Sequence, residues 1–229
     1  MLPAWTPLKT RRPKRTSRFS DLMAKRPPND DERARQLLAQ EAARIIVDQG
    51  LRDYRVAKTK AAERLGMHSR GALPGNAEIE QAISEHLLLF SGEAHMGLLQ
   101  RLRKTTLSVM RLLEDFSPRL VGPVLAGTAD ENSAINLHVF ADSSEVVALF
   151  LDEKNYACRL YERRLKRRRG RNVRPDIFPG YEFVYEKEPI EATVFPVDGI
   201  RQAPISPIDG KPMRRADEKA VLALLPTDR

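Results

Sequence analysis

Apolar residues in the first half of the chain recur three and four positions apart, the spacing of a helix with one buried face. This pattern predicts four helices, over residues 29–50, 53–65, 76–90 and 96–116. Asn29 and Asn76 can cap the first and third helices, and Gly50 and Gly66 can end the first two. The positions expected to face a core are Leu38, Ala42, Ile45, Ile46, Val56, Ala57, Ala61, Leu65, Ile79, Ile83, Leu87, Phe90, Met96, Leu99, Leu102, Thr106, Val109, Met110, Leu113 and Phe116.

After Ser117-Pro118 the spacing changes to the alternation and short apolar runs of β-strands. Strands are predicted over residues 120–126, 135–140, 156–166, 181–185 and 190–195, with the last two forming a hairpin that turns at Pro189. One helix is expected to start at Ser143-Ser144-Glu145 and to bury Val146, Leu149 and Phe150. We therefore predict an α+β protein in which an N-terminal helical layer is followed by a small mixed sheet.

Composition sets the broad class of the protein. The chain has 229 residues, 41% of them hydrophobic, and a single cysteine, Cys158, so a disulfide framework within the chain is excluded. The longest apolar run, residues 146–151, is far shorter than the roughly 20 residues of a membrane helix. The basic N-terminus is not followed by the apolar core of a signal peptide. We expect a soluble, cytoplasmic protein without a membrane partner.

Charge is unevenly distributed along the chain. Residues 1–28 carry a net +7 and residues 159–174 a net +8, which leaves −7 on the remainder of a chain whose total is +8. The first segment has several prolines and few apolar residues, which predicts a disordered tail. Such a tail is either an arm for an anionic partner or a solubilising extension. The expected organisation is this tail, a helical region over residues 29–117 and an α/β domain over residues 118–229 that ends in a loop extension.

The second basic segment is a candidate nucleic-acid contact. Its density of cations suits phosphate groups, and Tyr156, Tyr161, Phe178 and Tyr181 are close enough in sequence to stack on unpaired bases. The competing interpretation is a solvated loop between two strands, with these aromatic rings inside the sheet. The predicted contact residues are Arg163, Arg164, Lys166, Arg167, Arg168, Arg169 and Arg171.

The two glycine-ended helices near the N-terminus also admit a helix-turn-helix interpretation. Residues 50–70, however, lack a short turn followed by a clearly polar recognition helix. A helical cap packed on the following domain is favoured, and a DNA-binding regulator remains an alternative.

One segment resembles a known superfamily. The run Val124-Leu125-Ala126-Gly127-Thr128, a polar loop, and then Ser133-Ala134-Ile135-Asn136-Leu137 is similar to the signature of nucleotidyltransferases of the DNA polymerase beta type. Glu191, in a later strand, stands where the family has a third carboxylate, and residues 203–213 resemble the C-terminus of small bacterial proteins with this domain. The match covers about residues 118–196.

This resemblance implies a nucleoside triphosphate as ligand and Mg²⁺ as a possible cofactor. Gly127 permits a close backbone approach to phosphate, Thr128 supplies a hydroxyl, and carboxylates two residues apart on one strand would hold the metal. Those two positions are Ala134 and Asn136, so the metal motif is degenerate and Glu191 is its remaining candidate ligand. Asp130, Glu131 and Asp142 are nearby carboxylates, and His138 shares the parity of Asn136 along the strand.

Two hypotheses follow from these residues. In the first, the protein binds a nucleotide or nucleic acid without chemistry, through Gly127, Thr128, Asn136 and the basic run. In the second, it is an active Mg²⁺-dependent transferase on an unknown acceptor, with Glu191 and Asn136 as candidate catalytic residues and a metal site rebuilt from Glu191 with Asp130 or Asp142.

Overall fold

The computed structural model describes residues 30–51, 53–67, 73–170 and 172–226. Residues 1–28, expected to form a basic tail, the expected cap Asn29, and Arg171 therefore lie outside the described part. The fold is mixed α and β, with an N-terminal helical region followed by a five-stranded mixed sheet, and this confirms the predicted fold class. Among the described residues, no helix is both long and apolar enough to cross a membrane.

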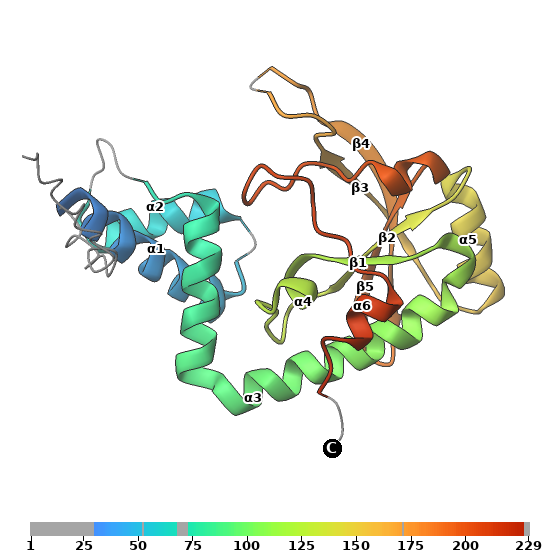
Figure 1. The fold of residues 1–229 in the computed structure, drawn as a ribbon, viewed down its shortest axis with the longest axis horizontal. Helices are drawn as coiled ribbons and strands as arrows, with labels where there is room; N and C mark the ends of the chain where they lie inside the picture. The colour runs from blue at the N-terminus through green and yellow to red at the C-terminus, as the bar shows by residue number, and fades with distance from the viewer. Residues whose placement is uncertain (1–29, 52, 68–72, 171, 227–229) are drawn as a thin grey trace, which may run out of the picture.

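In the described part of the first half of the chain there are three helices: α1 (Asp30–Gln49), α2 (Tyr54–Arg64) and α3 (Asn76–Leu112). The prediction of separate helices over 76–90 and 96–116 was wrong, because α3 is continuous from Asn76 to Leu112. The intervening residues contain no proline, and an isolated glycine such as Gly92 or Gly97 weakens a helix by about 1 kcal/mol without ending it. Instead, α3 bends near its middle (Figure 1).

The bend in α3 lets this one helix serve two separate cores. Its first part packs with α1 and α2 around Ile45, Ala57 and Ile79. Its second part, from Leu99 onward, belongs to the core of the sheet. The two cores thus divide within α3, and not at the change of sequence pattern near residue 117. Four residues that the helical spacing predicts to be buried are exposed: Val56, Leu65, Phe90 and Met96.

The segment 120–126 is not the strand predicted for it. Strand β1 (Arg119–Val121) is short, and a single-turn helix, α4 (Gly122–Ala126), follows directly. Gly122 leaves the strand with a φ of +73°, a conformation that glycine adopts at low cost. Pro123 then stands at the start of the helix, where its missing N–H would have no partner in any case.

The other strands are β2 (Ile135–Phe140), β3 (Arg159–Leu165), β4 (Asp176–Tyr185) and β5 (Glu188–Phe195). The sheet order is β1-β2-β5-β4-β3, and β2 with β5 is its parallel pair. The β4–β5 hairpin turns at Glu186-Lys187, both with positive φ, and not at Pro189, which lies inside β5. Two consecutive positive φ values match the twist of a tight hairpin.

The two faces of the sheet differ in character. One face carries Leu137, Ala192 and Phe183 and packs on the second part of α3 and on α5 (Ser144–Glu153). Helix α5 directs Val147 and Leu151 into this core, whereas Val146 and Leu149, predicted to be inside, are exposed. Three short helices complete the fold: the 3-10 helices η1 (Glu114–Phe116) and η2 (Val197–Arg201), and α6 (Glu218–Leu222).

The opposite face carries the polar residues, and the C-terminal segment, residues 202–216, crosses it. This segment pairs with the chain just after β3, where Ile205 bonds Lys166, and with β1, where Ala216 bonds Leu120. Beneath it a small cluster of Phe140, Phe178 and Phe195 fills one end of the face. The other end, which carries Asn136 and Glu191, stays open toward the helical region.

Gly180 makes it possible for side chains of β3 to cross this face. It lies in β4 between Tyr161 of β3 and Thr193 of β5. A Cβ atom at Gly180 would lie 2.4 Å from Tyr161 Cζ and 2.8 Å from the carbonyl oxygen of Ala192. Because the position carries no side chain, Tyr161 passes over β4 and its hydroxyl contacts Thr193 Oγ1 at 2.8 Å.

Replacing Gly180 by alanine should therefore destabilise the sheet. We expect Gly180→Ala to lower the free energy of unfolding by about 1–3 kcal/mol, the usual range for an overpacked core. Gly97→Ala is the matched control, because a Cβ there meets nothing within 4 Å and should stabilise α3 by up to about 1 kcal/mol. Urea unfolding measures the free energy of unfolding of both variants. Equal values for Gly180→Ala and Gly97→Ala would contradict the passage of Tyr161 over Gly180.

Candidate binding cavity

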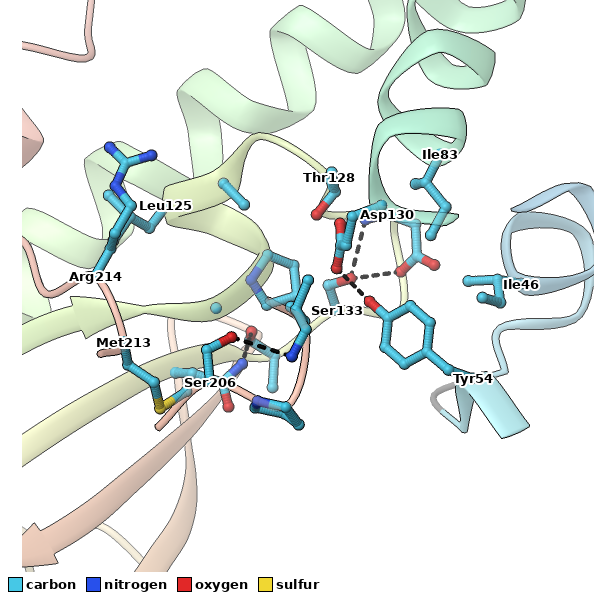
Figure 2. A pocket seen from close by; sticks show the side chains of 18 of the residues that line it. Ile46, Tyr54, Ile83, Leu125, Thr128, Asp130, Ser133, Ser206, Met213 and Arg214 are labelled. Atoms are coloured by element: carbon cyan, nitrogen blue, oxygen red, sulfur yellow. Dashed lines mark hydrogen bonds between the residues drawn. The ribbon is translucent and has the colours of Figure 1, made fainter. Parts of the chain in front are cut away.

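A cavity of about 620 Å³ lies between the helical region and the open end of the polar sheet face. In Figure 2, Tyr54, Ile83 and Ile46 line it from the helical side, and Ser206, Met213 and Arg214 from the C-terminal segment. Its complete lining is Ile46, Gly50, Leu51, Tyr54, Glu80, Gln81, Ile83, Ser84, Gly122, Pro123, Leu125, Ala126, Thr128, Asp130, Asn132, Ser133, Ala134, Asn136, Arg163, Glu191, Ser206, Pro207, Ile208, Asp209, Pro212, Met213 and Arg214. A cavity of this size accommodates a ligand as large as a nucleotide.

The floor of the cavity is formed by three side chains from three strands. The parallel register of β2 and β5 places Asn136 beside Glu191. Arg163 reaches them from β3, on the far side of β4, and its guanidinium donates to Glu191 Oε2 and lies 3.5 Å from Asn136 Oδ1. The guanidinium also lies over the ring of Tyr161, 5.4 Å from its centroid. Arginine suits this arrangement because its planar fork can bond two oxygens at once.

This triad changes the interpretation of the degenerate metal motif. Glu191, the predicted metal ligand, is paired with a side-chain cation. Ala134 contributes no ligand, and the Asn136 amide adds no charge. Within the described ranges, no group of three or more His, Cys, Asp or Glu residues is arranged to hold a metal ion. The Arg163 guanidinium therefore lies beside Asn136 and Glu191, two of the positions where the resemblance implies metal ligands.

The glycine beside Asn136 in the cavity wall is Gly122, and not Gly127, which the sequence pattern predicted. Gly122 lines the wall, and a Cβ there would lie 3.1 Å from Asn136 Nδ2. Gly127 is at the other end of α4, and its carbonyl oxygen lies 3.0 Å from Nε2 of the buried His95. Gly127 is therefore not part of the cavity lining, and its carbonyl anchors the loop to His95. Its neighbour Thr128 does line the cavity. The Gly122-Pro123 dipeptide was the available signal, since such pairs mark turns.

The three carboxylates near the predicted metal motif, those of Asp130, Glu131 and Asp142, fall into two groups. Asp130 lines the cavity, and its Oδ1 accepts hydrogen bonds from the Ser133 hydroxyl and the backbone N–H of Asn132, so it shapes the loop between α4 and β2. Glu131 and Asp142 are exposed and are not part of the lining.

His138 lies on the same face of β2 as Asn136, as predicted, but the C-terminal segment covers it. Its ring is buried, and its Nδ1 accepts a 3.0 Å bond from Arg215 Nε. Arg215 also donates to the carbonyl oxygens of Gly199 and Ile200 and lies over the ring of Phe195. Burial lowers the pKa of His138 well below 6.5, and the nearby Arg215 and Arg163 lower it further. Burial likewise lowers the pKa of Arg215 to about 10.

The predicted nucleic-acid contacts do not form one surface. Arg163 points into the cavity and Arg167 pairs with Asp176, whereas Arg164, Arg168 and Arg169 are exposed. The proposed stacking rings are unsuited to that role. Phe178 and Tyr181 are buried in cores, Tyr161 crosses the sheet, and Tyr156 packs against Phe183 and Tyr185.

Sequence reasoning missed the helical and C-terminal walls of the cavity. Tyr54 of α2 donates a hydrogen bond from its hydroxyl to Glu80 of α3, and both residues line the cavity. Residues 206–209 reach the helical region, where the Pro207 carbonyl accepts a 2.9 Å bond from Asn76 Nδ2. Nothing in the helical pattern distinguishes Glu80 from other surface glutamates. The cluster of Pro and Gly over 204–212 was the available signal for a structured loop.

Comparisons of this chain with protein-family models, with curated proteins and with solved structures find no match.

The buried His138 predicts a specific pH dependence of stability. Its lowered pKa means that below pH 6.5 the unfolded chain binds a proton that the folded chain excludes. The free energy of unfolding should therefore fall as the pH decreases below 6.5, by up to about 1.4 kcal/mol per pH unit from this group. Urea unfolding between pH 5 and pH 7.5 measures the slope.

The variant His138→Gln should lack this part of the slope. His86→Gln on α3 should retain it, because that change leaves His138 in place. If the free energy of unfolding depends on pH with the same slope in the wild-type protein and in His138→Gln, the pH dependence does not arise from His138.

Proposed function

We propose that this protein binds a nucleotide in the cavity without Mg²⁺ and does not carry out nucleotidyl transfer. The observation that carries the proposal is the ion pair of Arg163 with Glu191, next to Asn136. Transfer from a nucleoside triphosphate needs carboxylates that hold divalent cations against the reacting phosphate. Here the one remaining carboxylate of the motif already has a cationic partner.

The rest of the cavity supports binding. Apolar residues from the helical region and from the C-terminal segment, such as Ile83 and Met213, provide surface for a flat base. Arg163 provides a guanidinium group for a phosphate at the sheet end, and Arg214 of the C-terminal segment is a second arginine in the lining, since arginine is well matched to phosphate oxygens. The Gly127-Thr128 pair that resembles the family signature lies in the adjoining loop.

Thermal unfolding with a panel of nucleosides, nucleoside monophosphates and nucleoside triphosphates tests this proposal. A ligand at about 100 times its Kd adds roughly 2.7 kcal/mol, which raises the unfolding midpoint by about 5–10 °C for a chain of this size. We expect a rise that is the same in Mg²⁺ and in a chelator. Arg163→Met should abolish it, because the ligand then meets the negative charge of Glu191 without the guanidinium beside it.

The matched control is Arg101→Met, which removes an exposed arginine that pairs with Glu188 on another part of the surface. This variant should keep the full response. A rise that needs Mg²⁺, together with incorporation of label from a nucleoside triphosphate, would instead establish the active transferase.

A second candidate function is binding of a polyanion such as RNA by the β3–β4 hairpin. The observation that favours it is the exposure of Arg164, Arg168 and Arg169, whereas Arg159 and Arg167 are paired with acids. The hairpin projects from the edge of the sheet, away from the helices (Figure 1). Exposed cations on a projecting loop can reach phosphates without rearrangement of the sheet.

The double variant Arg168→Glu/Arg169→Glu should reduce retention of single-stranded RNA by about tenfold or more at low salt, and should lessen the salt dependence of binding. Arg33→Glu/Arg55→Glu on the helical region reverses the same number of charges and should have a smaller effect. Filter retention over a salt series measures both, and equal losses would remove this candidate.

A further inference from the structure

Two residues that line the cavity, Glu80 and Thr128, each carry a buried side-chain oxygen without a hydrogen-bond partner among the described residues, Oε2 and Oγ1 respectively. They come from different parts of the chain, Glu80 from α3 and Thr128 from the loop after α4. A buried polar atom without a partner is destabilising, so such atoms in a cavity mark positions where a ligand can supply the missing bond.

Glu80 is held in a defined orientation. Its Oε1 accepts the hydrogen bond from the Tyr54 hydroxyl, and this directs Oε2 elsewhere within the cavity wall. Figure 2 shows Tyr54 reaching from α2 toward the loop that carries Thr128, Asp130 and Ser133. A carboxylate oxygen only accepts hydrogen bonds, so its complement is an N–H or O–H group. The Thr128 hydroxyl can donate or accept.

The charges around the cavity limit the ligand further. The lining contains two arginines, Arg163 and Arg214, and four carboxylates, those of Glu80, Asp130, Glu191 and Asp209, which leaves a formal excess of two negative charges. Without a metal ion, this excess opposes a ligand with several phosphates. It is compatible with a neutral ligand, or with one phosphate placed at the arginines.

We propose that the ligand is a nucleoside carrying at most one phosphate, and that Glu80 and Thr128 bind donor groups of its sugar or base. This inference rests on the proposed nucleotide binding and adds the ligand class and the residues that select it. The Glu80 carboxylate accepts a ligand N–H or O–H, and the Thr128 hydroxyl bonds a neighbouring polar atom.

Isothermal titration of the full chain with nucleosides, nucleoside monophosphates, nucleoside triphosphates and inorganic tripolyphosphate, all in a chelator, tests the inference. We expect a nucleoside or its monophosphate to bind at least tenfold more tightly than the matching triphosphate, and tripolyphosphate not to bind. Glu80→Met should weaken the preferred ligand about tenfold or more, since it removes a charged hydrogen-bond acceptor.

Thr128→Val, which preserves the shape of the side chain, should also weaken binding, because it removes the hydroxyl. Glu93→Met is the matched control, because Glu93 is an exposed residue of α3 outside the lining, and it should not change the affinity. Unfolding midpoints without ligand establish that each variant is folded.

The possible outcomes separate the two proposals. Tighter binding of the triphosphate, or unchanged affinity in both Glu80→Met and Thr128→Val, would overturn this inference and leave nucleotide binding intact. Failure of every nucleoside and nucleotide to bind would overturn the proposed function as well.

Discussion

The candidate site depends on a close approach of side chain to backbone at Gly180. Strand β3 is at the edge of the sheet and β5 is near its centre, with β4 between them. A side chain at position 180 would occupy the space of the Tyr161 ring, which lies directly over the glycine. With that path clear, Tyr161 bonds Thr193, and Arg163, two residues further along the same face, reaches Glu191. One missing Cβ thus lets an edge strand place a cation at the centre of the polar face.

That cation defines the chemistry that the cavity can support. Arg163 neutralises Glu191 and lies close to Asn136, so the three side chains form a compact group with no requirement for a divalent ion. Arg163 lines the cavity, and a guanidinium has five N–H donors. The cavity of about 620 Å³ therefore has a salt bridge, Arg163 with Glu191, in its lining.

The C-terminal segment completes this cavity and is itself fixed by buried polar contacts. Arg215 bonds His138 and two backbone carbonyls and lies over aromatic rings, so the residues just before it are held against the sheet. A half-buried arginine is costly to desolvate, and the hydrogen bonds of its Nε and Nη1 and its ring contacts partly offset that cost, although its buried Nη2 has no partner among the described residues. The neutral His138 is the appropriate acceptor, because a protonated ring could not accept the bond from Arg215.

Local sequence patterns predicted the class of most elements and showed that positions 134 and 136 carry no carboxylate. Helical spacing identified α1 and α2, the alternation of Ile135, Leu137 and Val139 identified β2, and the identity of Ala134 and Asn136 already excluded a paired-carboxylate site. These are properties of local spacing and residue type. Only the tertiary structure decided that Arg163 pairs with Glu191 across β4, that Gly122 and not Gly127 adjoins Asn136, and that Glu80 faces the cavity. These contacts join residues far apart in the chain, and a local pattern carries no information about which distant strand or helix will lie opposite.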